Sequence, residues 1–257
     1  MGSRPVGSPK WEVIHGDALR LIAEIPDASI DAVITDPPYS SGGMFRGDRA
    51  AKTSTKYVLT GQVQEWPEFS GDTRDQRGYL MWCALWLSEC RRVTKPGAPV
   101  VLFTDWRQLP TTTDALQAGG FIWRGIASWD KTEAARPSMG AYRNQCEYLV
   151  WGTNGPSNTS MDVGCLPGAW RVPVEKGDEK QHMTGKPLDL MRQVVLICPP
   201  GGTILDPFAG SGTTIVAARE EGRSAIGFEI TPAYAAIAQA RLAAATGAPM
   251  LDFTEAK

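Results

Sequence analysis

The amino-acid sequence predicts a single α/β domain whose strands form a mainly parallel sheet. Short apolar runs rich in β-branched residues alternate with longer segments of helical periodicity, which is the pattern of strands joined by crossover helices. A chain of 257 residues is long enough to bury one core of this kind. Its composition, 42% hydrophobic and 21% charged, is that of an ordinary globular protein.

The two ends of the chain are expected to lie outside this domain. Residues 1–10 are rich in Gly, Pro and Ser, which predicts a disordered tail, and residues 247–257 are interpreted as a second tail. The predicted domain is therefore 11–246. No apolar run approaches the roughly 18 residues of a membrane span. Five scattered cysteines indicate neither a zinc site nor a disulfide framework, and a reducing cytoplasm is the expected location.

The first elements end in polar residues. An apolar strand at 11–14 is followed by His15-Gly16-Asp17, and Asp17 is a natural N-cap for a helix over 18–25. A second, β-branched strand at 30–34 runs into Thr35-Asp36-Pro37-Pro38-Tyr39. Two prolines stop this strand because neither can donate to a ladder. We therefore expect Asp36 to lie at the open carboxyl edge of the sheet.

The residues after this second strand have a specific chemistry. Asp36 offers carboxylate acceptors, the two prolines offer carbonyls without competing N–H groups, and Tyr39 offers a flat aromatic face. Acceptors beside a stacking ring suit a planar group with an exocyclic amine, such as a nucleobase. The alternative reading is a Pro-Pro turn followed by a packing tyrosine.

The long segment at 40–78 is irregular and locally basic. A net charge of −2 gives no general attraction to nucleic acid, so DNA binding would need local positive loops. This segment has one, directly after the Asp36 motif, with Arg46, Arg49, Lys52 and Lys56. We interpret it as a mobile loop that orders on substrate binding, with a solvated surface loop as the alternative.

The middle of the chain continues the alternation of helices and strands. A helix is predicted from Gly78 to Arg92, with Trp82 and Trp86 four residues apart and expected in the core. A buried strand at 99–103 and a helix at 111–118 follow.

Two further strands, starting at 121 and at 147, predict a hairpin. Their connection is a second basic loop, with Lys131, Arg136 and Arg143. Residues 152–181 are Gly-, Pro- and Asn-rich, carry mixed charge and include Arg171.

A second motif follows the strand at 203–206. The chain enters a Gly-Ser-Gly turn and then a helix, so glycines permit close approach of a ligand to free helical N–H groups. No Lys follows Gly212 and the third glycine of a dinucleotide fingerprint is missing, which argues against both of those sites. The next strand ends at Glu229, an acid suited to ribose hydroxyls. A nucleoside cofactor without a pyrophosphate fits best.

The two motifs together resemble those of the amino-methylating DNA methyltransferases that use S-adenosylmethionine. Their signatures are Asp-Pro-Pro-Tyr, here 36–39, and Phe-x-Gly-x-Gly, here 208–212. The target motif comes first and the cofactor motif last, which matches the circularly permuted beta group over residues 11–245. The resemblance implies a Rossmann-like methyltransferase fold, with a mainly parallel seven-stranded sheet and an antiparallel hairpin.

The resemblance also implies roles for individual residues. In such enzymes Asp17 would bind the adenine amine of the cofactor, Glu229 the ribose, and Lys186, in a Lys-Pro motif, the methionine carboxylate. The implied catalytic residues are Asp36, Pro37, Pro38 and Tyr39. The implied cofactor residues are Asp17, Lys186, Asp206, Pro207, Phe208, Ala209, Gly210, Ser211, Gly212, Thr213 and Glu229. The candidate DNA contacts are Arg46, Arg49, Lys52, Lys56, Lys131, Arg136, Arg143 and Arg171, and no metal is expected.

The implied reaction is methyl transfer to an exocyclic amine of a base flipped out of double-stranded DNA. An initial Asp rather than Ser favours N6 of adenine in this family, with N4 of cytosine as the alternative. A cofactor- and DNA-binding module without catalysis is the rival from another class. Residues 152–181 are the expected target-recognition segment. A homodimer and a cognate restriction endonuclease are the implied protein partners.

Overall fold

The computed structural model describes residues 10–39, 74–135, 137, 139–157, 163–174 and 185–246. Several sequence predictions fall on residues outside these ranges. They are most of the 1–10 tail, the 247–257 tail and most of the mobile loop predicted at 40–78, with Arg46, Arg49, Lys52 and Lys56. Arg136 and parts of the target-recognition segment predicted at 152–181 also lie outside the described residues.

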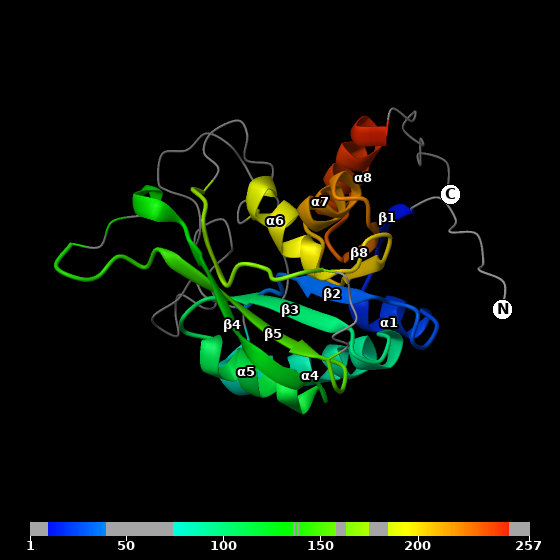
Figure 1. The fold of residues 1–257 in the computed structure, drawn as a ribbon, viewed down its shortest axis with the longest axis horizontal. Coiled ribbons are helices and arrows are strands. Elements are labelled where there is room, and N and C mark those ends of the chain that lie inside the picture. The colour runs from blue at the N-terminus through cyan, green and yellow to red at the C-terminus, as the bar shows by residue number, and fades with distance from the viewer. Residues whose placement is uncertain are drawn as a thin grey trace.

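A single sheet runs through the described part of the chain, with eight strands in the order β1-β8-β7-β2-β3-β5-β4-β6 (Figure 1). The strands are β1 Trp11–His15, β2 Ala32–Thr35, β3 Pro99–Thr104, β4 Ile122–Asp130, β5 Cys146–Thr153, β6 Ala169–Arg171, β7 Thr203–Asp206 and β8 Ser224–Glu229. Neighbouring strands are parallel except for β5, which is antiparallel to both β3 and β4. The predicted fold class and hairpin are confirmed, and the short strand β6 is added to the seven that were expected.

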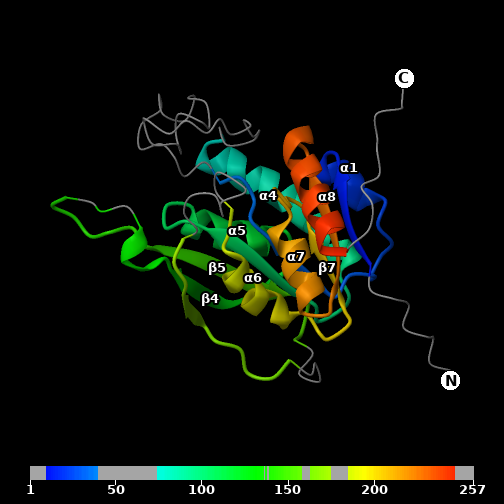
Figure 2. The same ribbon diagram turned by 90° about the horizontal axis from the view of Figure 1, so that it is seen from above.

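Helices cover both faces of the sheet. They are α1 Ala18–Ala23, α4 Gln76–Val93, α5 Leu109–Ala118, α6 Leu188–Val194, α7 Thr213–Glu220 and α8 Pro232–Thr246, with 3₁₀ turns at Thr132–Ala134 and Val195–Ile197. Helices α1, α4 and α5 pack on one face, and α6, α7 and α8 on the other, as Figures 1 and 2 show. No helix in the described ranges is long and apolar enough to cross a membrane.

The central strands are the most apolar because both of their faces are covered. Every residue of β2 and of β3 is buried, which explains why these strands appear in the sequence as continuous apolar runs rather than alternating ones. Strand β4 lies towards the edge, and its side chains Ile122, Trp123 and Ile126 are exposed.

Two helices end earlier than the sequence pattern suggested, and a proline follows each. Helix α1 ends at Ala23 rather than at residue 25, and Pro26 lies three residues further along the chain. The sequence after Lys186-Pro187 predicts a helix through Cys198, but α6 ends at Val194 and tightens into the 3₁₀ turn before Pro199. The residue before a proline disfavours the α conformation, which accounts for both early ends.

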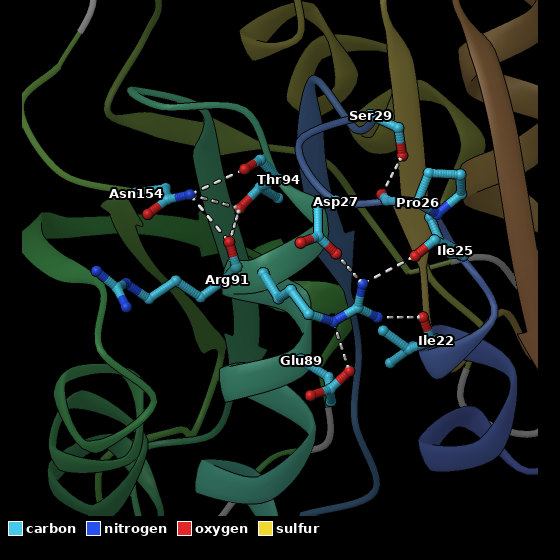
Figure 3. A network of polar contacts seen from close by, with 10 residues as sticks. Ile22, Ile25, Pro26, Asp27, Ser29, Glu89, Arg91, Thr94 and Asn154 are labelled. Carbon is cyan, nitrogen blue, oxygen red and sulfur yellow. Dashed lines mark hydrogen bonds and ion pairs between the residues drawn. The ribbon is translucent and has the colours of Figure 1, made fainter.

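Arg92, at the end of α4, ties that helix to α1 (Figure 3). Its guanidinium donates to the carbonyls of Ile22 and Ile25, each at 2.9 Å, and to the carboxylates of Asp27 and Glu89. In the same network the side chain of Asn154, just after β5, donates to the carbonyls of Arg91 and Thr94. The Ile22 carbonyl, in the last turn of α1, therefore accepts from a charged donor of α4 in addition to the Ile25 backbone N–H.

We predict that Arg92→Met lowers the free energy of unfolding by about 1–3 kcal/mol, because the Ile22 and Ile25 carbonyls lose their charged donor. Urea unfolding followed by tryptophan fluorescence measures this change. Arg91→Met is the matched control, since the exposed Arg91 enters the network through its backbone carbonyl only. It should stay within about 0.5 kcal/mol of wild type, and equal losses in the two variants would contradict the assignment.

Candidate active site

The two sequence motifs line one cavity of about 410 Å³ at the carboxyl ends of the parallel strands. The strand pairing explains this, because β2 and β7 are parallel neighbours, with Val33 opposite Leu205. Their following residues therefore emerge side by side. The predicted residues that line the cavity are Asp17, Asp36, Pro37, Pro38, Tyr39, Lys186, Asp206, Pro207, Phe208, Ala209, Gly210, Ser211, Thr213 and Glu229.

Asp206 links the two motifs directly. Its Oδ1 accepts hydrogen bonds from the Thr35 hydroxyl at 2.6 Å and from the Phe208 backbone N–H at 3.1 Å. The side chain is only 2% exposed. Burial raises the pKa of Asp206 to about 6, against hydrogen bonds from Thr214, Thr35 and Phe208 that lower it. Asp206 thus holds the end of β2 against the start of the glycine turn.

Gly212 is the one predicted cofactor residue that does not line the cavity, and its backbone explains its identity. It precedes α7 with φ of +82°, in the left-handed region that favours glycine. A Cβ at this position would also lie 2.9 Å from the Cβ of Ala238 in α8. Gly212 therefore shapes the turn and lets α8 pack against it.

Two carboxylates on the cavity wall are held by backbone N–H groups. Glu229 accepts from Gly210 at 2.9 Å and from Thr231 at 2.7 Å. Asp17 accepts from Leu19 at 3.0 Å, so its predicted role as the N-cap of α1 is confirmed. Both carboxylates also line the cavity, and their roles towards a nucleoside stay predictions.

Lys186 lines the cavity, and its contact with the methionine carboxylate of the cofactor stays a prediction. Its Nζ lies 2.5 Å from Asp36 Oδ2 and 3.2 Å from Glu147 Oε2, and the residue is 7% exposed. Lys186 is therefore not a solvated surface lysine, the alternative that its sequence context left open. The structure pairs this ammonium with two protein carboxylates.

The charges around Lys186 shift one another. Burial alone would lower the pKa of the Lys186 ammonium, but the attraction of Asp36 and Glu147 raises it, so the lysine stays cationic. Burial raises the pKa of Asp36, and the attraction of Lys186 opposes this. Burial also acts to raise the pKa of Glu147, but Lys186 and Lys131 bring it below its ordinary value.

Sequence reasoning missed Glu147. It lies near the start of β5, which is antiparallel, so that its beginning meets the carboxyl ends of the parallel strands. An acidic residue opening an otherwise apolar strand is a signal that could have identified it.

Sequence reasoning also placed Trp82 wholly in the core. Trp86 is fully buried, as predicted, but Trp82 lines the cavity with its ring centroid 5.1 Å from that of Phe208. The guanidinium of Arg74 lies 4.1 Å from the centroid of the Trp82 ring. Helical periodicity predicts that both tryptophans lie on one face of α4. It does not predict which part of that face packs in the core and which part lines the cavity. The other lining residues that were missed are Gly16, Ala18, Leu19, Arg74, Phe103, Gly185, Met191, Thr214, Ile230, Thr231 and Tyr234.

The remaining basic candidates have protein partners. Lys131 lies 2.5 Å from Glu147, so it belongs to the buried charges rather than to an open phosphate-binding loop. Arg143 donates to the carbonyls of Glu133 and Ala135. Arg171, on β6, pairs with Glu133 at 2.8 Å but keeps 62% of its side chain exposed. Within the described residues no group of three or more His, Cys, Asp or Glu side chains could hold a metal ion.

Comparison with known proteins shows the family of the chain. The N6/N4 methyltransferase family model, described as DNA methylase, matches residues 30–167 and 162–240, which is most of the chain. The chain belongs to this DNA methylase family.

Relatives of known sequence span most of this DNA methylase. The protein YubD of Escherichia coli K12, named as a methylase, is 30% identical over 90% of this chain and 89% of its own length. The Type II methyltransferase M.HinfI of Haemophilus influenzae is 28% identical over 90% of this chain and 67% of its own. Among solved structures, the complex of M1.HpyAVI with SAM has a TM-score of 0.65 at 23% identity, covering 90% of this chain and 98% of that one. At that identity the structural likeness shows the fold.

The raised pKa of Asp206 predicts a specific pH dependence of stability. Between about pH 4 and pH 6 the native state holds a proton that the unfolded chain has released. Ionisation of Asp206 therefore lowers the free energy of unfolding as pH rises through this window. Asp206→Asn cannot ionise. Between pH 4 and pH 6 the free energy of unfolding of wild type should therefore fall, relative to that of Asp206→Asn, by on the order of 2–3 kcal/mol.

Chemical unfolding at a series of pH values measures this difference, with Asp114→Asn, an exposed aspartate of α5, as the matched substitution. A difference between Asp206→Asn and wild type that stays constant from pH 4 to pH 6 would contradict the prediction.

Proposed function

We propose that this DNA methylase transfers a methyl group from S-adenosylmethionine to the exocyclic N6 amine of an adenine rotated out of duplex DNA. The observation that carries the proposal is the single cavity in which the Asp36–Tyr39 motif faces the 206–212 turn. A cofactor held by one motif and a base held by the other would meet inside it. The M1.HpyAVI complex with SAM, a relative in fold, supports the choice of cofactor.

The residues present fit this cofactor. The Glu229 carboxylate is fixed by two backbone N–H groups and suits the two ribose hydroxyls. Asp17, on the same wall, suits the adenine amine, and the turn at 207–211 lets the ligand lie against its backbone. When bound, S-adenosylmethionine supplies a methyl group on a positively charged sulfur.

The Asp36 end of the cavity fits an amine. Its Oδ2 is bound to Lys186, while its Oδ1 accepts no hydrogen bond within the described residues although it is buried. A buried acceptor without a donor is costly, so a substrate amine hydrogen would satisfy it. The ring of Tyr39 is on the same wall and offers a stacking surface for the base.

Those acceptors also explain how the chain would promote the reaction. The lone pair of an adenine amine is delocalised into the ring, so the nitrogen is planar and weakly nucleophilic. Hydrogen bonds from the amine to Asp36 and to the Pro37 carbonyl would favour a pyramidal nitrogen, whose lone pair would attack the methyl carbon in line. The carbon–sulfur bond would break as the nitrogen–carbon bond forms, which leaves the sulfur as a neutral thioether. The amine proton, acidic only once the methyl group has arrived, would pass to the Asp36 carboxylate or to solvent. The chain contributes positioning and electrostatic stabilisation, without a covalent intermediate.

The proposal for adenine rather than cytosine rests on the resemblance, in which an initial Asp favours N6. The same geometry would serve N4 of cytosine, which is therefore an outcome of the test. Duplex DNA would approach the cavity edge, where the connection after β4 projects from the molecule (Figure 1) and exposes Tyr142 to 97%. The homodimer and the cognate endonuclease remain predictions.

The reaction is tested by transfer of tritiated methyl groups to unmethylated genomic DNA, followed by digestion to nucleosides. We predict label in N6-methyladenine with wild type and a rate at least about 10²-fold lower with Asp36→Ala, which removes the acceptor. Asp114→Asn, far from the cavity lining, serves as the control and should keep the wild-type rate.

Label in N4-methylcytosine would retain the mechanism and overturn the choice of base. Absence of label in any DNA, with cofactor still bound, would favour the non-catalytic module.

Cofactor binding is tested separately by calorimetry. Glu229→Gln should bind S-adenosylmethionine roughly tenfold more weakly, because a neutral acceptor replaces a charged one at the ribose. Glu220→Gln, at the far end of α7, is the matched control and should bind as wild type does. A 2′-deoxyribose analogue should lose less affinity in Glu229→Gln than in wild type. Equal losses would place the ribose elsewhere.

A further inference from the structure

Four charged side chains form a chain of contacts behind the cavity. Lys131 Nζ lies 2.5 Å from Glu147 Oε1, Glu147 Oε2 lies 3.2 Å from Lys186 Nζ, and Lys186 Nζ lies 2.5 Å from Asp36 Oδ2. The four residues come from four separate segments of the chain. Two cations and two anions alternate, so the buried group is neutral as a whole.

The surroundings of Lys186 leave its ammonium few alternatives. Its Nζ lies 5.1 Å from the ring centroid of Phe103 and 5.9 Å from that of Tyr39, and the residue is almost fully buried. Its ammonium therefore faces the two carboxylates: it donates a hydrogen bond to Asp36 Oδ2 and forms an ion pair with Glu147 Oε2. Glu147 therefore determines how the ammonium is shared and which oxygen of Asp36 it reaches.

We propose that Glu147 is a positioning residue for methyl transfer: acting through Lys186, it holds Asp36 with Oδ2 tied and Oδ1 free for the substrate amine. This inference rests on the proposed function, because it assigns to Asp36 the role of acceptor. Neither the sequence motifs nor the resemblance assigned a role to Glu147.

Pairing of the Lys186 ammonium with both Asp36 and Glu147 has an electrostatic consequence as well as a geometric one. An ammonium paired with Asp36 alone would draw most strongly on that carboxylate and weaken it as an acceptor. The Glu147 carboxylate also attracts the Lys186 ammonium and so reduces its pull on Asp36. The positive charge of Lys131 in turn balances the negative charge of Glu147. The arrangement leaves Asp36 Oδ1 able to accept a hydrogen bond while Oδ2 is paired with Lys186.

Charges of both signs face Asp36 and act on its pKa in opposite directions. Lys186 and Lys131 lower the pKa of Asp36, and Glu147 raises it, beside the dominant effect of burial. Asp206 and Tyr79 are the other titratable groups coupled to it. Removing the charge of Glu147 should therefore lower the pKa of Asp36, and removing that of Lys131 should raise it.

The test is a ¹³C NMR titration of cofactor-free protein labelled at the aspartate side-chain carboxyls, with the Asp36 signal assigned from Asp36→Asn. We expect Glu147→Gln to lower the Asp36 titration midpoint by about half a pH unit or more, and Lys131→Met to raise it. Glu12→Gln, an exposed glutamate of β1, is the matched control and should leave the midpoint unchanged.

Single-turnover methyl transfer then connects the titration to the reaction. In Glu147→Gln the fall of the methyl-transfer rate on the acidic side of its pH dependence should move to lower pH, by the same amount as the Asp36 titration midpoint measured by NMR. The plateau rate should fall about tenfold, with KM for DNA unchanged, because Asp36 is drawn more closely to Lys186. Glu147→Asp, which retains the charge, should recover part of that rate.

The outcomes separate the inference from the proposed function. An Asp36 midpoint that does not move in Glu147→Gln, or that moves the same way in Lys131→Met, overturns the role of Glu147 whether or not the protein methylates DNA. If Glu147→Gln fails to fold, Lys131→Met alone decides, because Lys131 is nearer the surface and its expected shift has a fixed sign. Absence of methyl transfer by wild type, with both NMR shifts as expected, overturns the proposed reaction instead.

Discussion

The parallel pairing of β2 with β7 is the constraint on which the rest of the site depends. It joins a strand near the start of the chain to one near its end, and both strands stop at the same edge. The residues after each strand face one cavity only because of this pairing, and the hydrogen bond from Thr35 to Asp206 fixes their separation. The order of the two motifs along the chain is immaterial to the geometry, since strand adjacency alone brings them together.

A second regularity is that the polar groups of the cavity are held before any ligand arrives. Backbone N–H groups hold Glu229 and Asp17, neighbouring donors hold Asp206, and Lys186 holds one oxygen of Asp36. A preorganised site has little reorganisation to undergo during reaction, which is where electrostatic stabilisation is most effective. Among the described residues, Asp36 Oδ1 lines this cavity as a buried acceptor without a hydrogen-bond donor, whereas the unpaired Oε2 of Glu147 faces the Lys186 ammonium.

Sequence reasoning predicted the elements and both motifs because their signals are local. Asp36-Pro37-Pro38 ends a strand and Gly212 opens a helix by the chemistry of their own backbone. Glu147 and Trp82 were missed because their roles depend on tertiary contacts. The first needs the antiparallel direction of β5, and the second needs the point where α4 passes the cavity. Lys186 was singled out from its Lys-Pro motif, but its partners Asp36 and Glu147 could not be known, since they lie in distant segments of the chain. Strand β6 was missed because three residues give no usable periodicity.

The strand order also bears on how this protein folds. Strand β1 pairs with β8, and β2 pairs with β7, so the first strands acquire these partners only when the last part of the chain is present. Contacts of such long sequence separation close large loops and slow the search for the native state. During synthesis the apolar strand β2 would lack its neighbour β7, and so leave one edge unpaired, while more than half of the chain is still being made. Newly made protein is therefore more exposed to aggregation and to chaperone capture than the compact final fold suggests.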